Sequence, residues 1–493
     1  MSSVPATLPP HENANKPAWY DERRRGCVHV KHLLSLLIAA AVSVLVMAGA
    51  APGATVQARS ADSFVESLGV NTHYGNGIFT GGNAYADRRI DAKLGALGIR
   101  HIRDHSYNAE GVGFVDNINA TYGIRANLIL GETTRSPADL VTLLKAHPAY
   151  EAIEGLNEPE FAGNRSYNGF TDNSSANQYP ATRAFQNDLY AAIKADPQLG
   201  GITVLSPAMG RSNRSQFLIP INFDVAAMHS YPWASPTTFA DKPSGGVDQA
   251  LSDMSALRGT KPLWATESGY YNQLPTNTKS VPENISGKYT PRLYAEFFNR
   301  GIRRTYLYEL ADQGPDTTAR EQNFGLLRFD MTEKPAYTSL KNLIDLVEEP
   351  GAPATFTPSS LAYTITAPAS VHHTLLQKSD GRFYVMLWNE VLSYDSVNKV
   401  DLNPTDVATT LALQDGEFDA RIFEPNASIN PLSTYAHVTS LNLAVPDQVM
   451  VVELTRVPEP ASAATILLAG VGSLLLPRRR RRQGGRPLNR SKP

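Results

Sequence analysis

Two glutamates about a hundred residues apart have the type and spacing to do chemistry. Glu158 lies in Gly-Leu-Asn-Glu-Pro-Glu at 155–160, and Glu267 lies in Leu-Trp-Ala-Thr-Glu-Ser-Gly at 263–269. Each follows an apolar run that is typical of a buried parallel strand. Two carboxyl groups at one rim of a barrel suit retaining glycoside hydrolysis, because one must protonate the leaving oxygen while the other attacks the sugar carbon. The pair predicts a secreted retaining glycosidase acting on O-glycosyl bonds of a polysaccharide or oligosaccharide.

Eight short apolar runs that alternate with amphipathic stretches are the elements that must position these glutamates. The predicted strands are 68–71, 101–103, 126–130, 152–156, 203–206, 225–228, 263–265 and 305–308, with helices at 86–97, 137–147, 182–195, 247–257 and 291–300. Eight βα units predict a closed (β/α)8 TIM barrel with its chemistry at the carboxyl ends of the strands. A doubly wound sheet is the competing fold, but residues 69–73 lack the glycine-rich phosphate loop expected after its first strand.

The barrel is predicted to span 59–349 and to end with a helix over 334–347. After Glu-Glu-Pro-Gly-Ala-Pro at 348–353 the pattern changes to short alternating runs such as 384–388 and 449–454. This pattern predicts an all-β sandwich over 353–456. The second domain could bind glycan or support the barrel, and we favour support because no dense row of exposed aromatic residues is evident.

Composition limits the partners of the chain. The 493 residues exceed what one hydrophobic core usually supports, and 42% hydrophobic with 19% charged residues is ordinary for a globular protein. A formal charge of -2 predicts no electrostatic affinity for nucleic acid. The single cysteine, Cys27, precedes the predicted domains, so no internal disulfide is expected.

Residues 1–58 are predicted to be a basic leader and a secretory signal peptide. An apolar run at 33–51 follows Arg23, Arg24, Arg25 and Lys31, and small residues follow it, so cleavage after Ala50 or after Ala58 is compatible. A true transmembrane helix is the alternative, because the run is near the minimum length that spans a bilayer.

The carboxyl terminus, 457–493, has three parts in order. Val-Pro-Glu-Pro at 457–460 is followed by an apolar stretch at 461–476 and by five arginines at 478–482. The arginines would hold the end of a membrane helix on the cytoplasmic side. The segment resembles the PEP-CTERM sorting signal of Gram-negative bacteria. The resemblance implies transient anchoring through this helix, processing by an exosortase-type enzyme and release to the cell surface or matrix. An ordinary membrane anchor is the alternative.

The predicted barrel also resembles glycoside hydrolase clan A over residues 68–347. Asn157-Glu158-Pro159 matches the clan's Asn-Glu-Pro motif on the fourth predicted strand, and Glu267 falls on the seventh. The resemblance implies that Glu158 is the acid/base, that Glu267 is the nucleophile and that Asn157 holds the sugar 2-hydroxyl. Arg103 matches an arginine on the second strand, and His229 and Tyr231 match the sixth strand's contribution. The implied substrate is a carbohydrate.

The chemistry of the pair explains these residue types. Carboxyl groups about 5 Å apart cannot both ionise comfortably, so one stays protonated. Arg103 and Tyr231 are expected to keep Glu267 ionised by donating to it. Glu158, which lacks such a donor in this interpretation, is expected to carry the proton. The segment 161–179 is expected to overhang the cleft and shape its subsites.

Each residue also has a structural interpretation. Arg103 could be a surface ion-pair partner and His229 a core histidine. Aromatic residues at strand ends could stack on sugar or plug the barrel; they are Trp233, Trp264, Tyr270, Tyr271 and Tyr308. Glu309 could contact substrate hydroxyls or pair with Arg303 or Arg304.

Two other functions remain open at this point. A metal-dependent hydrolase would need clustered histidines, whereas His73, His105 and His229 are scattered, so no metal and no cofactor is expected. A catalytically inactive barrel that binds glycan in the matrix is the non-enzymatic alternative. The motifs do not specify which sugar is bound or whether the enzyme acts within or at the end of a chain.

Overall fold

The computed structural model describes residues 54–75, 84–105, 108–233, 239–352 and 355–458. Residues 1–53 of the predicted signal peptide and 459–493 of the predicted sorting signal lie outside the described residues. Within the described part of the chain, no helix is long and apolar enough to cross a membrane.

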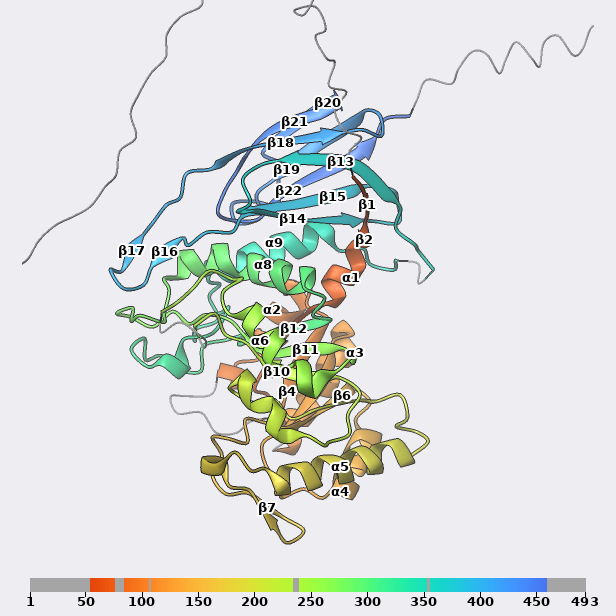
Figure 1. Ribbon diagram of the computed structural model, residues 1–493, viewed down its shortest axis with the longest axis vertical. Helices are drawn as coiled ribbons and strands as arrows, with labels where there is room; N and C mark the ends of the chain where they lie inside the picture. The colour runs from red at the N-terminus through yellow and green to blue at the C-terminus, as the bar shows by residue number, and fades with distance from the viewer. Residues whose placement is uncertain (1–53, 76–83, 106–107, 234–238, 353–354, 459–493) are drawn as a thin grey trace, which may run out of the picture. The chain divides into compact units, whose positions relative to one another are not determined.

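Eight parallel strands form the predicted barrel (Figure 1). They are β3 (Leu68–Asn71), β4 (His101–Asp104), β5 (Arg125–Leu130), β6 (Tyr150–Leu156), β9 (Thr203–Leu205), β10 (Ala226–His229), β11 (Leu263–Ser268) and β12 (Arg304–Leu307). Adjacent strands pair in chain order, β12 pairs with β3, and a parallel bridge between Leu205 and Val225 closes the ring. Each strand overlaps its predicted range, so the TIM barrel prediction is confirmed.

Helices lie between the strands and cover the barrel. They are α1 (Ala61–Glu66), α2 (Arg89–Leu97), α3 (Ala109–Tyr122), α4 (Pro137–Ala146), α5 (Pro180–Ala195), α6 (Val247–Asp253), α7 (Ser255–Arg258), α8 (Glu283–Asn299) and α9 (Pro335–Val347). Ser136 caps α4 in a capping box with Asp139. The helix predicted at 291–300 starts earlier in the structure, at Glu283, because Pro291 lies inside α8 and not at its start. The predicted helix at 247–257 is interrupted at Met254.

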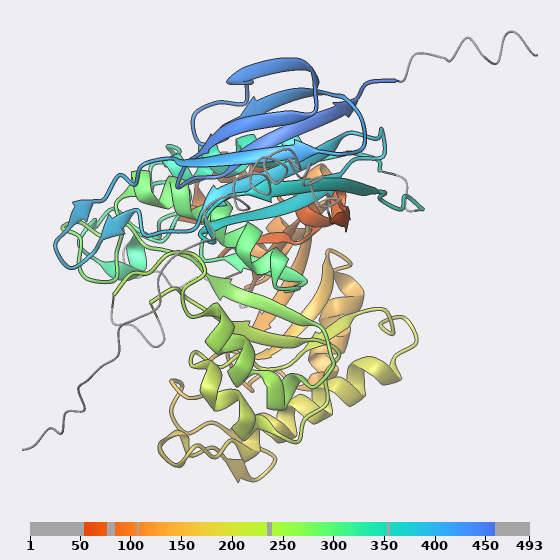
Figure 2. The same ribbon diagram turned by 45° about the horizontal axis from the view of Figure 1, so that its top comes forward.

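The second domain is a sandwich of two sheets, drawn mostly in teal and blue (Figure 2). It also includes β1 (Thr55–Gln57) and β2 (Arg59–Ser60), and its strands pair antiparallel except for β2, which runs parallel to β14. One sheet has the order β1-β13-β18-β21 and the other β2-β14-β15-β22-β19-β20. The bounds are β13 (Ser360–Thr366), β14 (Val371–Gln377), β15 (Phe383–Asn389), β18 (Val407–Leu413), β19 (Phe418–Phe423), β20 (Ser433–Val438), β21 (Ser440–Val445) and β22 (Met450–Arg456). A separate hairpin is formed by β16 (Tyr394–Asp395) and β17 (Val400–Asp401). The predicted strands at 384–388 and 449–454 lie in β15 and β22.

Two short strands before the barrel belong to the sandwich, which the sequence did not predict. β1 (Thr55–Gln57) pairs with β13, and β2 (Arg59–Ser60) pairs with β14. Ala58 between them is buried in the sandwich core. The chain therefore contributes to the second domain before it enters β3.

Helix α8 joins the barrel to the sandwich through buried polar contacts. Arg292 forms an ion pair of 2.7 Å with Glu390, and both side chains are fully buried. Trp388 on β15 donates its indole N–H to Glu296 at 2.7 Å. These contacts link α8 to the sandwich, and a supporting role for the sandwich stays a prediction.

Candidate active site

Glu158 directly follows β6, at the carboxyl end of the barrel. Its backbone has a positive φ of 40°, and its amide donates to the carbonyl of Ala208 at 2.9 Å. The preceding residue, Asn157, bridges to Ala208 as well. The turn after β6 is thus tied to the loop after β9. This fixes the direction in which the Glu158 carboxylate leaves the backbone.

Glu267 lies near the end of β11 and is held by two donors. Arg103 on β4 donates from Nη1 to Oε1 at 2.8 Å, and the Tyr231 hydroxyl donates to Oε2 at 2.8 Å. Burial, reinforced by the charge of Glu267, raises the pKa of Tyr231 well above its ordinary value, so the phenol stays a donor. Both expected donors to Glu267 are therefore in place.

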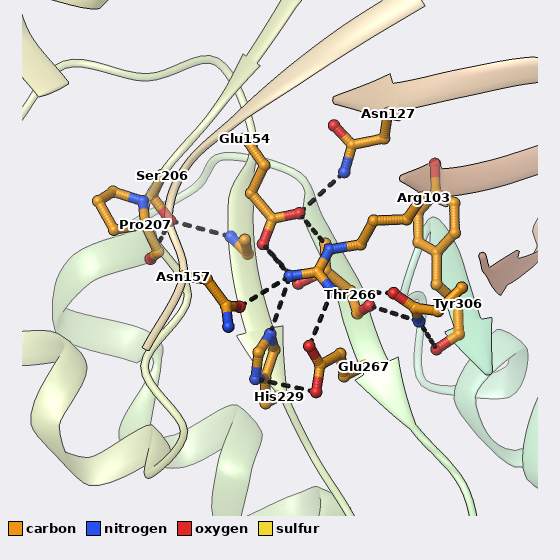
Figure 3. A network of polar contacts seen from close by, with 12 residues as sticks. Arg103, Asn127, Glu154, Asn157, Ser206, Pro207, His229, Thr266, Glu267 and Tyr306 are labelled. Atoms are coloured by element: carbon orange, nitrogen blue, oxygen red, sulfur yellow. Dashed lines mark hydrogen bonds and ion pairs between the residues drawn. The ribbon is translucent and has the colours of Figure 1, made fainter. Parts of the chain in front are cut away.

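Arg103 sits below the cleft in a network of polar side chains (Figure 3). Its Nε and Nη2 bind the two oxygens of Glu154, its Nη1 also reaches Asn71, and its Nη2 also reaches Asn157. Together with the bond to Glu267, these contacts occupy the five N–H donors of a guanidinium. Arg103 is only 3% exposed. Arg103 therefore positions Glu267 and Asn157, and its predicted role in binding substrate stays a prediction.

His229, the last residue of β10, lies between the two glutamates. Its Nδ1 is 2.8 Å from Oε1 of Glu158 and 3.5 Å from Oε2 of Glu267, while its Nε2 is 3.4 Å from Nη2 of Arg103. An ionised carboxylate only accepts hydrogen bonds, so Nδ1, which faces the carboxylates of Glu158 and Glu267, is the nitrogen that carries the proton towards them. His229 is therefore a donor to Glu158, and the expectation that Glu158 lacks one was wrong.

The contact between His229 and Glu158 shifts the titration of both groups. Burial opposes ionisation of Glu158, but the hydrogen bond and charge of His229, with a smaller effect of Arg103, lower the pKa of Glu158 below its usual value. Burial alone would lower the pKa of His229, but the charges of Glu267 and Glu158 outweigh it and raise that pKa. The two groups titrate as a coupled pair.

The glutamates open into a cleft of about 660 Å³. Five of the predicted site residues besides the glutamates line it: Asn157, His229, Tyr231, Trp233 and Tyr308. Trp233 packs on Tyr231 with ring centroids 4.7 Å apart. The other aromatic candidates are core residues: Trp264 packs inside the barrel against Tyr306, and Tyr270 and Tyr271 are buried outside the cleft lining.

Two further expectations change with the structure. Glu309, which was expected to contact substrate or to pair with Arg303 or Arg304, is fully buried and pairs with His73 at 2.8 Å and with Gln313 at 2.9 Å. Of the segment 161–179, only Phe161 lines the cleft. The rest includes the hairpin of β7 (Ser166–Tyr167) and β8 (Phe170–Thr171) and the short helix η2 (Ser174–Ala176), and Tyr167 packs against Phe185 of α5.

Sequence reasoning missed Glu154, the fully buried partner of Arg103. Thr266 and Asn127 also donate to it, at 3.0 and 2.8 Å. A glutamate in the middle of the apolar strand β6 was the signal that could have found it, because an ionised group in a core needs a partner. Arg211, Lys279 and other cleft residues come from loops, where a single sequence gives no such signal.

Within the described residues, one group of three could offer ligand atoms to a metal ion: Glu158, His229 and Glu267, whose atoms lie within 4.8 Å of one another. Both oxygens of Glu267 already accept hydrogen bonds, and Arg103 lies beside His229. A metal ion bound here would be repelled by the guanidinium of Arg103, which is buried and permanently charged. The donor set therefore suits carboxylate chemistry better than metal binding.

Comparison with known proteins identifies the fold. A family 39 glycoside hydrolase from the gut symbiont Bacteroides cellulosilyticus is similar, with 14% identity over 80% of this chain and 82% of that chain and a TM-score of 0.53. A glucosidase from Croceicoccus marinus matches at 10% identity over 82% of this chain and 98% of that one, with a TM-score of 0.49. An endoxylanase of glycoside hydrolase family 30 from Clostridium papyrosolvens matches at 11% identity over 82% and 98% of the two chains, with a TM-score of 0.45.

No family model matches the sequence. No curated protein matches it either. At 14% identity the family 39 likeness establishes the barrel fold and leaves the chemistry to the site itself.

Proposed function

We propose that this protein is a glycoside hydrolase that retains anomeric configuration. The observation that carries the proposal is the separation of the carboxylates: an oxygen of Glu158 and an oxygen of Glu267 lie within 4.8 Å. Retaining enzymes keep their two carboxyl groups about 5–5.5 Å apart, whereas inverting enzymes need about 6.5–9.5 Å to admit a water. The position of both groups at the carboxyl ends of barrel strands supports the same chemistry.

In the proposed reaction Glu267 is the nucleophile. Arg103 and Tyr231 keep its carboxylate ionised and aimed, and one oxygen attacks the anomeric carbon as the bond to the leaving oxygen breaks. The product of this step is a glycosyl ester of Glu267. Water, deprotonated by Glu158, then cleaves the ester and returns both carboxyl groups to their starting states.

The proton for the leaving oxygen comes from the pair of Glu158 and His229. Nδ1 of His229, in the imidazolium form, gives its proton to Oε1 of Glu158, which then carries the acid proton. That oxygen protonates the leaving group as the glycosidic bond breaks. The negative charges of Glu267 and Glu158 outweigh burial and raise the pKa of His229 above its ordinary value, which favours the imidazolium that supplies this proton.

The experiment that tests this function is covalent labelling. The protein is incubated with 2-deoxy-2-fluoro derivatives of β-glucosyl, xylosyl, galactosyl and mannosyl fluorides and an arabinosyl fluoride, and peptides are mapped by mass spectrometry. One sugar should add to Glu267, and Glu267→Gln should abolish both labelling and turnover. Label on a peptide without Glu267 would refute the assignment. Sugar binding without turnover by the unaltered protein would favour the inactive glycan-binding alternative.

We further propose that the protein is exported through its amino-terminal signal and is processed at its PEP-CTERM-like segment by an exosortase-type enzyme. The support is the order of Pro-Glu-Pro, apolar stretch and arginines at 457–482. The substrate would then be an extracellular glycan at the surface or in the matrix of a Gram-negative bacterium. Intact-mass measurement of the secreted protein should show a carboxyl terminus near residue 460, and a retained arginine cluster would argue for an ordinary anchor.

A further inference from the structure

One aromatic ring at the rim of the cleft has no role in the reaction described above. Phe161 lines the cleft and is 56% exposed. Single exposed apolar residues are common on protein surfaces and need no explanation by themselves. Phe161 differs because it is fixed to the acid/base residue: its amide donates to the carbonyl of Glu158 at 2.9 Å.

The ring is held against the neighbouring loop as well. A Cβ on Gly210 would lie 2.4 Å from Cε2 of Phe161 and 2.7 Å from Oε1 of Glu158, so only glycine allows this close packing. The next residue, Arg211, donates its amide to Glu160 at 2.9 Å. The two loops form one rigid rim beside the Glu158 carboxylate.

A cation completes this rim. The Arg211 guanidinium lies 5.1 Å from the centre of the Phe161 ring and also lines the cleft. Arg211 lines the same cleft as Phe161, and among the described residues its guanidinium forms no ion pair with a carboxylate. A flat apolar face beside N–H donors matches a pyranose ring, whose C–H face is apolar and whose edge carries hydroxyl oxygens.

The position of the rim relative to Glu158 determines which sugar unit of the substrate would bind to it. A general acid must lie within hydrogen-bond reach of the oxygen that it protonates, so the leaving-group sugar lies on the side of Glu158. Glu267, Tyr231 and Trp233 belong to the strands and loops on the other side. Phe161 and Arg211 follow β6 and β9, next to Glu158.

We propose that Phe161 and Arg211 form the subsite for the leaving-group sugar, with the ring as the stacking surface and the guanidinium as the hydrogen-bond donor. This inference rests on the proposed glycosidase function. A substrate whose leaving group is too small to reach the rim distinguishes failure of the subsite proposal from failure of the glycosidase proposal. A glycosyl fluoride meets this need, because fluoride leaves without touching Phe161.

The test compares kcat for the fluoride of the sugar that labels Glu267, which includes hydrolysis of the glycosyl ester by Glu158, with kcat/KM for the β-linked disaccharide of that sugar. Phe161→Ala should lower the disaccharide value by roughly tenfold and leave the fluoride value within about twofold, and Phe161→Trp should restore it. Arg211→Met should also weaken only the disaccharide. Phe170→Ala is the matched control, because Phe170 is 51% exposed but does not line the cleft.

Three outcomes would overturn the subsite. A comparable fall in kcat on the fluoride would mean that Phe161 only positions Glu158, because Glu158 is the base that hydrolyses the glycosyl ester formed from either substrate. No loss on either would mean that the rim does not touch substrate. A loss on the disaccharide of equal size in Phe170→Ala would place the leaving sugar elsewhere. Absence of turnover of every fluoride by the unaltered protein would refute the glycosidase function instead.

Discussion

Replacing Arg103 by methionine tests the network below the cleft. Arg103 is buried, and its loss leaves the carboxylates of Glu154 and Glu267 without their cation. Removing one partner of a buried ion pair costs about 3–5 kcal/mol, because the other charge stays in a medium that solvates it poorly. Arg103→Met should therefore lower the free energy of unfolding by this amount. Misplacement of Glu267 should also lower kcat/KM by at least about a hundredfold.

The assay is denaturant unfolding together with kinetics below the unfolding transition. Adding Glu154→Gln to Arg103→Met should recover part of the stability, because it removes one unpaired charge, and should not recover activity. Arg292→Met is the matched control, since its ion pair with Glu390 is equally buried but lies at the sandwich. It should lose similar stability and keep kcat/KM. Equal stability of Arg103→Met and the unaltered protein would refute the reasoning.

Three further predictions concern pH, metals and maturation. The basic limb of the pH–activity profile should lie above the ordinary pKa of histidine, because the Glu158–His229 pair loses its proton only as pH rises through the raised pKa of His229. The variant His229→Asn should move that limb to lower pH. An unchanged limb would show that the pair does not hold the proton. Dialysis against EDTA should leave kcat unchanged, whereas loss restored by a divalent ion would mean that the three-residue group binds metal. Amino-terminal sequencing of the secreted protein should find a start before Thr55, since cleavage after Ala58 would remove β1; a start at residue 59 would contradict this.

The sequence by itself determined the barrel and the two glutamates. Strand β3 matches its predicted range, because a buried parallel strand is a continuous apolar run that is visible without any partner. The same rule placed Glu158 and Glu267 at strand ends, and parallel strands deliver their carboxyl ends to one rim. Helix α8 was predicted only in part, because Pro291 lies buried inside it, whereas a local rule places proline at the start of a helix.

Only the tertiary structure decided which partners the site residues contact. Arg103 and Glu154 are 51 residues apart, and nothing local tells a guanidinium which of several carboxylates it will meet. The distance between His229 and Glu158, which sets the titration of both, depends on the closure of the ring through Leu205 and Val225. Hydrogen bonds and pKa values depend on separations of a few ångströms in space. The sequence sets the order of the strands along the chain, and closure of the barrel sets the distances between the side chains that they carry.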